Sequence, residues 1–140
     1  MKTKNLIIIL GLALMISYCK KSPTESGSKP FLKTLWTLDS FDISGKIINP
    51  PEDQVYNIRF LDDGTFHAKS DCNEIIGHFI IDSANSLNVD SIVTTKVYCG
   101  TGSMYEKYYE AIGVMKSYEI ANDRLNIYYG NNEKLNFQGE

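Results

Sequence analysis

The residues best suited to chemistry lie near the middle of the chain. Asp71 and Cys72 stand between His67 and His78, and a thiol, a carboxylate and two imidazoles could together bind a metal ion or activate a nucleophilic cysteine. Their spacing matches no standard zinc pattern, and no imidazole lies beside Cys72 or Cys99 in the sequence. We therefore expect no metal site and no catalytic cysteine, with His67 exposed on a strand and His78 half-buried.

Two carboxylate pairs, Glu52-Asp53 and Asp62-Asp63, are the other candidates for acid–base chemistry. Each pair lies in a turn signal, where solvated carboxylates that bond to the turn are the better explanation. The chain has no glycine-rich phosphate loop, no Ser-His-Asp order and no metalloprotease motif. These observations favour a protein that is not an enzyme and needs no cofactor.

The start of the chain has the pattern of an export signal. Lys2 and Lys4 precede an apolar run over residues 6–16, which is too short to span a bilayer and has the length of a signal-peptide core. The run leads to Cys19 through Ile-Ser-Tyr, which resembles the lipobox of bacterial lipoproteins, although Tyr18 departs from the small residue usual before that cysteine. We expect residues 1–18 to be a lipoprotein signal peptide and Cys19 to carry the lipid; a free thiol after an ordinary signal peptide is the alternative.

Residues 19–30 then read as the lipidated cysteine and a flexible tether. Ser, Pro, Gly, Thr and Lys dominate this stretch, and such a composition cannot bury enough apolar surface to fold. No Asp follows Cys19 directly, a feature that resembles lipoproteins sorted to the outer membrane. We expect a bacterial envelope protein, anchored to a membrane through its N-terminal lipid, with one domain over residues 31–140.

The charge balance argues against nucleic acid as a partner. The chain carries a net charge of −3, and loss of Lys2 and Lys4 with the signal peptide would leave an acidic excess of about five. Phosphate neutralisation requires clustered basic residues, and the lysines that approach a cluster fall in the expected tether.

Export also places Cys72 and Cys99 where disulfides persist. Both cysteines flank the ends of expected strands, so they could pair, and closing that loop would contribute about 3.5 kcal/mol to stability in the chain-entropy model. Two buried thiols that pack as small hydrophobes are the alternative.

The domain reads as short strands separated by turns, with one helix. In the segment 55–61, Tyr56, Ile58 and Phe60 share one face, and Gly77 lies on the inward face of a later strand, where it would let a bulky neighbour approach. Ser103 and Glu106 form a capping-box pattern at a helix start. The expected strands cover residues 35–41, 55–61, 65–70, 75–81, 87–97 with an irregularity near 90–91, 117–121, 124–129 and 134–137; the helix covers 103–115, with a core stripe of Tyr105, Tyr108, Tyr109, Ile112 and Met115.

This ordered set of residues resembles the META domain family, the group that includes the heat-inducible bacterial protein HslJ. The resemblance covers nearly all of residues 35–137 and departs at Ala68 and Asp71, where glycines are expected. Its motif is centred on the Cys72-Asn73 pair and Gly77, and the other matching positions are Trp36, Leu38, Phe60, Gly64, Phe66, Phe79, residues 95–99, Glu106, Tyr118, residues 125–127 and Phe137. The resemblance implies a mainly β (α+β) fold: a small, partly open antiparallel β-barrel of about eight strands with one packed α-helix.

Two functions from different classes follow. The first is a non-enzymatic, lipid-anchored envelope module that binds or stabilises another envelope component; the family resemblance adds an association with stress. The second is a carrier that encloses a small apolar ligand in the manner of lipocalins. A carrier needs a cavity of about 300 Å³ or more, whereas Trp36, Phe60, Phe66 and Phe79 are bulky enough to fill a small barrel.

Overall fold

The computed structural model describes residues 27–83 and 85–140. The expected signal peptide over residues 1–18, the anchor Cys19 and most of the tether lie outside the described residues. Within them the chain forms nine strands and one helix. The elements are β1 Trp36–Ile43, β2 Lys46–Ile48, β3 Tyr56–Phe60, β4 Thr65–Ser70, β5 Asn73–Ile80, β6 Asn88–Thr94, α1 Tyr105–Gly113, β7 Ser117–Ala121, β8 Arg124–Gly130 and β9 Glu133–Gly139.

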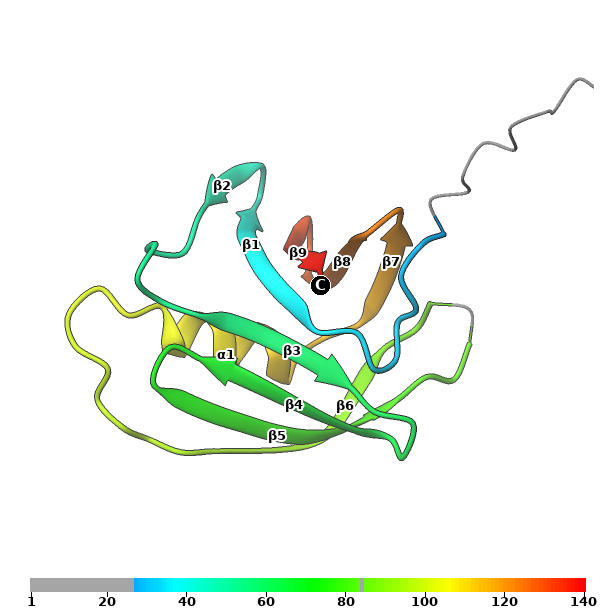
Figure 1. Ribbon diagram of the computed structural model, residues 1–140, viewed down its shortest axis with the longest axis horizontal. Helices are drawn as coiled ribbons and strands as arrows, with labels where there is room; N and C mark the ends of the chain where they lie inside the picture. The colour runs from blue at the N-terminus through cyan, green and yellow to red at the C-terminus, as the bar shows by residue number, and fades with distance from the viewer. Residues whose placement is uncertain (1–26, 84) are drawn as a thin grey trace, which may run out of the picture.

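Eight of the strands form one curled antiparallel sheet in the order β6-β5-β4-β3-β1-β9-β8-β7, and β2 pairs with β1 alone. The sheet bends around α1 as an open half-barrel (Figure 1). Its edges β6 and β7 approach each other at one corner, where Ser86 and Ser117 form an isolated bridge and the Leu87 amide donates to the Lys116 carbonyl at 2.9 Å. The partly open antiparallel barrel with a packed helix is therefore confirmed.

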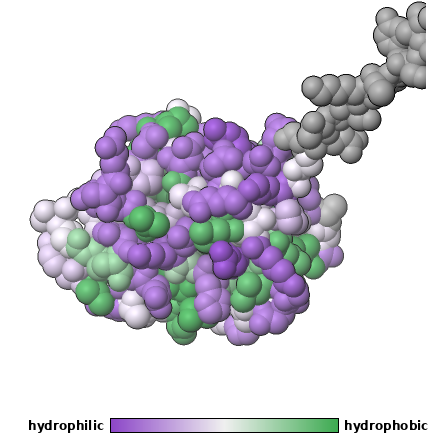
Figure 2. Space-filling model, viewed as in Figure 1, coloured by the Kyte–Doolittle hydropathy of each residue, from purple (hydrophilic) through white to green (hydrophobic). Residues whose placement is uncertain are grey.

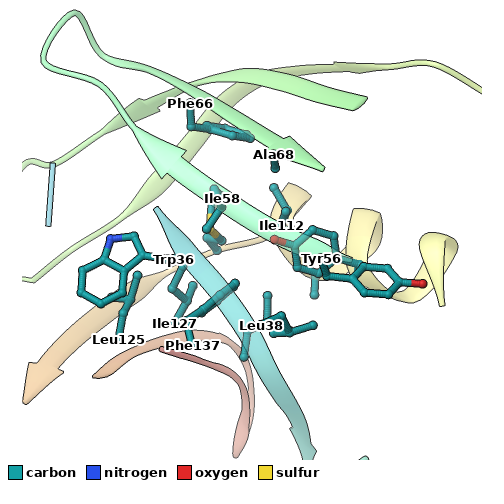
Figure 3. Close-up of a cluster of buried hydrophobic side chains, with 14 of the residues drawn as sticks. Trp36, Leu38, Tyr56, Ile58, Phe66, Ala68, Ile112, Leu125, Ile127 and Phe137 are labelled. Atoms are coloured by element: carbon teal, nitrogen blue, oxygen red, sulfur yellow. The ribbon is translucent and has the colours of Figure 1, made fainter. Parts of the chain in front are cut away.

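Strand alternation decides which side chains enter the core. Tyr56, Ile58 and Phe60 on β3 are buried, and Phe66 and Ala68 on the paired strand β4 are buried opposite them. These side chains converge with those from β1, β8, β9 and α1 in one cluster (Figure 3). The most bulky buried members are Trp36, Tyr56, Tyr108, Phe41, Phe60, Phe66 and Phe137.

The turn between β3 and β4 forms as its residue types predict. Gly64 has a φ of +81°, which glycine adopts without the strain that a side chain would add. The Asp63 carboxylate accepts hydrogen bonds from the Thr65 amide at 2.9 Å and from the Thr65 hydroxyl at 2.6 Å. Asp63 therefore acts in the turn, as expected for this carboxylate pair.

The sequence predicts that the chain turns over residues 42–45, but strand β2, which follows this turn, was missed. Ile43 pairs directly with Lys46, and the two residues between them, Ser44 and Gly45, have φ values of +54° and +85°. Two positive φ values are typical of the tight turn that suits a two-residue hairpin. β1 therefore runs on to Ile43, beyond the end predicted at residue 41.

The predicted capping box at the start of the helix is wrong. Helix α1 begins at Tyr105, with Met104 at the N-cap position and no side-chain cap hydrogen bond. The Met104 amide donates instead to the Tyr56 hydroxyl at 2.8 Å, and the Ser103 hydroxyl accepts from the Tyr105 amide at 3.3 Å. A tertiary contact therefore sets where the helix begins.

Candidate functional site

A disulfide joins Cys72 to Cys99, with their Cα atoms 5.5 Å apart. Cys72 lies in the turn between β4 and β5, where Asp71 takes a φ of +56°. Cys99 lies in the segment between β6 and α1, residues 95–103, which we call the strap. The bond therefore fixes the middle of the strap to the end of a central hairpin.

Asn73 holds the same strap through hydrogen bonds. Its side-chain oxygen accepts from the Val97 amide at 2.8 Å and from the Thr95 hydroxyl at 2.9 Å, and its amide nitrogen donates to the Val97 carbonyl at 2.9 Å. Asn73 is fully buried, so the side chain exchanges water for these partners. Removing it would leave the partly buried amide and carbonyl of Val97 without their partner, and the cost for a fully buried group would be about 1–3 kcal/mol.

Gly77 admits the ring of Phe66 to the core. The two residues are direct cross-strand partners, and a Cβ placed on Gly77 would lie 2.5 Å from the Phe66 ring and 2.5 Å from the Ser91 carbonyl oxygen. The register between β5 and β6 shifts next to this position, between His78 and Phe79. The close approach at Gly77 and the irregularity near residues 90–91 both lie where the sequence predicts them.

The histidines and acidic residues near Cys72 do not assemble into a metal site. Both His67 and His78 are exposed on the outer side of the sheet, so the expectation of a half-buried His78 is wrong. Strand alternation explains this, because Gly77 and Phe79 occupy the inward positions on either side. Within residues 27–83 and 85–140, no group of three or more His, Cys, Asp or Glu side chains could hold a metal ion.

The carboxylate pairs take part in turns and surface contacts. Hydrogen bonds from Lys33 lower the pKa of Asp62, and those from Thr65 lower the pKa of Asp63. Glu52 and Asp53 are exposed in the loop before β3. Asp71 differs, because its Oδ2 atom is buried without a hydrogen-bond partner among the described residues.

A groove of about 640 Å³ lies between the strap and helix α1. We call it the tyrosine groove, because three tyrosines line it and Tyr98, in the strap, is 80% exposed. The strap lies at the left end of Figure 1, and the same end has pale, intermediate hydropathy in Figure 2. The lining residues are Lys96, Val97, Tyr98, Cys99, Gly100, Ser103, Tyr105, Glu106, Tyr109 and Glu110.

Helix α1 forms one wall of the tyrosine groove. Tyr105 and Tyr109 are stacked with ring centroids 6.0 Å apart, and the Tyr105 hydroxyl donates to the Thr95 carbonyl at 3.4 Å. The prediction of a core stripe is wrong for Tyr105, which is only half-buried, whereas Tyr109 is half-buried and packs against the core. Tyr108, Ile112 and Met115 from that stripe are in the core.

The sequence interpretation missed the tyrosine groove as a site. Its two walls come from the strap and the helix, and the contacts that bring them together run through Asn73 and Cys72, more than twenty residues earlier. The available signal was Tyr98, a large aromatic residue between Lys96 and Gly100 with no apolar alternation around it.

Comparison with known proteins gives a family and a fold. The family model for the META domain matches residues 29–140. An NMR structure of a protein from Burkholderia xenovorans aligns with a TM-score of 0.65 at 17% identity, over 79% of this chain and 83% of that one. A crystal structure of a DUF4847 family protein from Bacteroides vulgatus aligns with a TM-score of 0.57 at 20% identity, over 77% and 93%. These identities show a shared fold alone.

No curated protein sequence matches the chain significantly. Among the residues that the structure describes, no helix has the length and apolar character needed to cross a bilayer.

Proposed function

Because this chain belongs to the META domain family, we propose that it is a non-enzymatic binding module, held at the bacterial cell envelope by a lipid on Cys19. In this proposal the tyrosine groove is the surface that contacts another envelope component. The module stabilises that component, and the need for it rises under stress.

The anchor is supported by the order of the N-terminal segments. A basic start, a short apolar run and the sequence Ile-Ser-Tyr before Cys19 agree with processing at that cysteine. The polar stretch before the domain would act as a flexible spacer between the lipid and the folded part. The outer membrane is the proposed location.

The exposed Tyr98 is the observation that carries the binding role. Tyrosine gives a large, rigid contact area at a low cost in side-chain entropy, and it is enriched in the buried centres of protein interfaces. Here an 80% exposed tyrosine stands over a groove whose strap is fixed by a disulfide and by Asn73. A surface that is already ordered avoids part of the entropy cost of binding.

The interior of the half-barrel gives the carrier function no support. Trp36, Phe60 and Phe66 fill its inward face with no exposed surface, and Phe79 packs against them. A second hollow, of about 350 Å³, lies on the outside of β3, β4 and β5, with His67, Arg59 and Glu74 in its wall. Neither hollow is the enclosed apolar chamber that a carrier requires.

Site-specific photocrosslinking in intact cells tests the proposal. A photoreactive phenylalanine derivative replaces Tyr98 in the full chain, and in a matched control it replaces Ile47, which is 55% exposed on β2. We expect a discrete crosslinked species from position 98 alone, which disappears when Cys19→Ala prevents anchoring. Absence of a reproducible species at position 98, together with unchanged heat and antibiotic survival after gene deletion, would reject the proposal.

A further inference from the structure

We propose that the tyrosine groove binds an extended segment of a partner protein that carries basic side chains at alternate positions. This inference rests on the proposed function, since it assigns a chemistry to the partner of the same groove. It is carried by the order in which helix α1 places its tyrosines and glutamates.

Two parallel rows of side chains run along the groove wall of α1. Tyr105 and Tyr109 form one row, one helical turn apart and stacked. Glu106 and Glu110, also one turn apart, form the neighbouring row and are exposed. Neither glutamate forms an ion pair within the described residues. The wall therefore presents aromatic faces beside two carboxylates that have no basic partner there.

The charge of the lining favours a cation. Glu106 and Glu110 face one basic residue, Lys96, among the residues that line the groove. A basic side chain entering the groove can lay its aliphatic stem on the tyrosine row and bring its charged end to the glutamate row. Arginine suits this arrangement best, because its planar group stacks on aromatic rings and pairs with carboxylates.

The spacing of the two rows favours an extended chain. Side chains four residues apart on a helix are about 5–6 Å apart at Cβ. In an extended peptide, side chains on the same face recur every second residue, at about 6.6 Å. Two basic residues at alternate positions can therefore meet Glu106 and Glu110 together, with the intervening residue turned toward the strap.

The strap supplies the opposite wall. Val97 and Tyr98 are 57% and 80% exposed there, and Asn73 fixes the backbone of Val97 on both its amide and its carbonyl. An apolar residue between the basic positions can pack on these side chains. A β-branched residue such as valine suits this position because it favours the extended β conformation, in which alternate side chains share one face.

The test measures binding of two synthetic peptides to the full chain, purified in a neutral detergent. The first peptide alternates arginine with valine, which favours the extended conformation; the second replaces each arginine with glutamate. We expect the arginine peptide alone to bind, with an affinity that falls as salt is added because the pairs are exposed. The variant Glu106→Gln/Glu110→Gln should bind about two- to thirtyfold more weakly, as expected for the loss of two exposed ion pairs.

A second double variant controls for net charge. Asp82→Asn/Asp123→Asn also removes two carboxylates, but from the loop between β5 and β6 and the turn between β7 and β8, which lie at the far end of the molecule from the strap (Figure 1). It should bind the arginine peptide like the wild type. Tyr98→Ala should weaken binding at least about fivefold, as for an aromatic interface residue, whereas Tyr98→Phe keeps the ring and should stay within about twofold. Circular dichroism checks that each variant folds.

Three outcomes would overturn the inference. They are equal binding of the two peptides, no binding of the arginine peptide at about 1 mM, and equal loss of affinity in both double variants. Binding of peptidoglycan glycan fragments that depends on Tyr98 but not on Glu106 and Glu110 would also overturn it, in favour of a saccharide site. A crosslink at position 98 combined with any of these results would leave the proposed function standing and reject the basic segment alone.

Discussion

At the scale of single residues, Asn73 and Gly77 position the site in two different ways. The side chain of Asn73 bonds to both the amide and the carbonyl of Val97, as the backbone of a paired strand would. Gly77 acts through the side chain it lacks, since the ring of Phe66 occupies that space. One residue holds the strap near the hairpin end, and the other lets the hairpin pack on the core.

Gly77→Ala should lower the free energy of unfolding by about 1–3 kcal/mol, the usual cost of overpacking. The added methyl group would meet the Phe66 ring and a backbone oxygen at 2.5 Å, so neither neighbour can yield cheaply. Denaturant unfolding measures the change. Gly113→Ala is the matched control, because no atom beyond its chain neighbours and its own helix backbone lies within 4 Å of its Cβ position, and it should not destabilise. Equal stability of the two variants would show that the close approach is not as described.

Tyr108 is a buried phenol whose hydroxyl has no hydrogen-bond partner among the described residues. An unpaired buried polar group carries a desolvation cost, so Tyr108→Phe should raise the free energy of unfolding at neutral pH by about 1 kcal/mol. Thermal or urea unfolding would show it. A loss of stability of similar size would mean that the hydroxyl has a bonding partner, such as an internal water.

The same substitution should change how the free energy of unfolding depends on pH in alkaline solution. Burial raises the pKa of Tyr108 well above its usual value, so the folded state holds its proton more tightly than the unfolded state. The stability from this group is complete below the unfolded pKa of about 10 and is lost as pH rises toward the folded value. Above pH of about 10, wild-type stability should fall more steeply than that of Tyr108→Phe, by about 1.4 kcal/mol per pH unit. Equal slopes would contradict this burial.

At the scale of elements, the strap is the segment on which the tyrosine groove depends. It leaves the sheet at β6, returns to Cys72 and Asn73, and then enters α1 through Met104, whose amide bonds to Tyr56. Residues 95–103 have no strand or helix of their own. Their position therefore comes mainly from the disulfide and Asn73, together with the Thr95 amide, which donates to the Glu74 carbonyl at 3.1 Å, and the Tyr105 hydroxyl, which donates to the Thr95 carbonyl.

Reducing the disulfide, or replacing it in Cys72→Ala/Cys99→Ala, should remove about 3.5 kcal/mol of stability in the chain-entropy model. Hydrogen exchange should locate part of the effect in the strap, with faster exchange at the Val97 amide, while amides of β8 and β9 keep their protection relative to global unfolding. Binding at the tyrosine groove should weaken in parallel. Unchanged exchange at Val97 after reduction would show that the hydrogen bonds of the strap hold it without the disulfide.

The sequence predicted the elements whose signals are local and missed those set by distant contacts. The strands at residues 65–70 and 117–121 match β4 and β7 residue for residue, because alternation and turn residues bound them on both sides. The turn over residues 42–45 was predicted, but strand β2 was missed because it has only three residues and lies just before the prolines. The helix start was misplaced because Tyr56, far away in sequence, bonds at Met104.

At the scale of the whole molecule, a curled sheet leaves one gap, and the helix lies within its curve (Figure 1). The core is packed with aromatic side chains, and on the face in Figure 2 apolar residues form small separate groups among hydrophilic ones. The family and the barrel followed from the sequence, because the order of strands, turns and glycines is spread over the whole domain. The tyrosine groove did not, since its walls meet only after folding.

The structure links Cys72 to Cys99, and in the proposed function the domain lies in an oxidising envelope compartment, tethered through a lipid on Cys19. The intact mass of the protein purified from cell envelopes, measured before and after reduction, tests both features at once. We predict a mature chain that begins at Cys19, carries the added mass of its acyl chains and gains two hydrogens on reduction. A mature chain that begins elsewhere, or one without acyl chains and with no gain on reduction, would contradict the account.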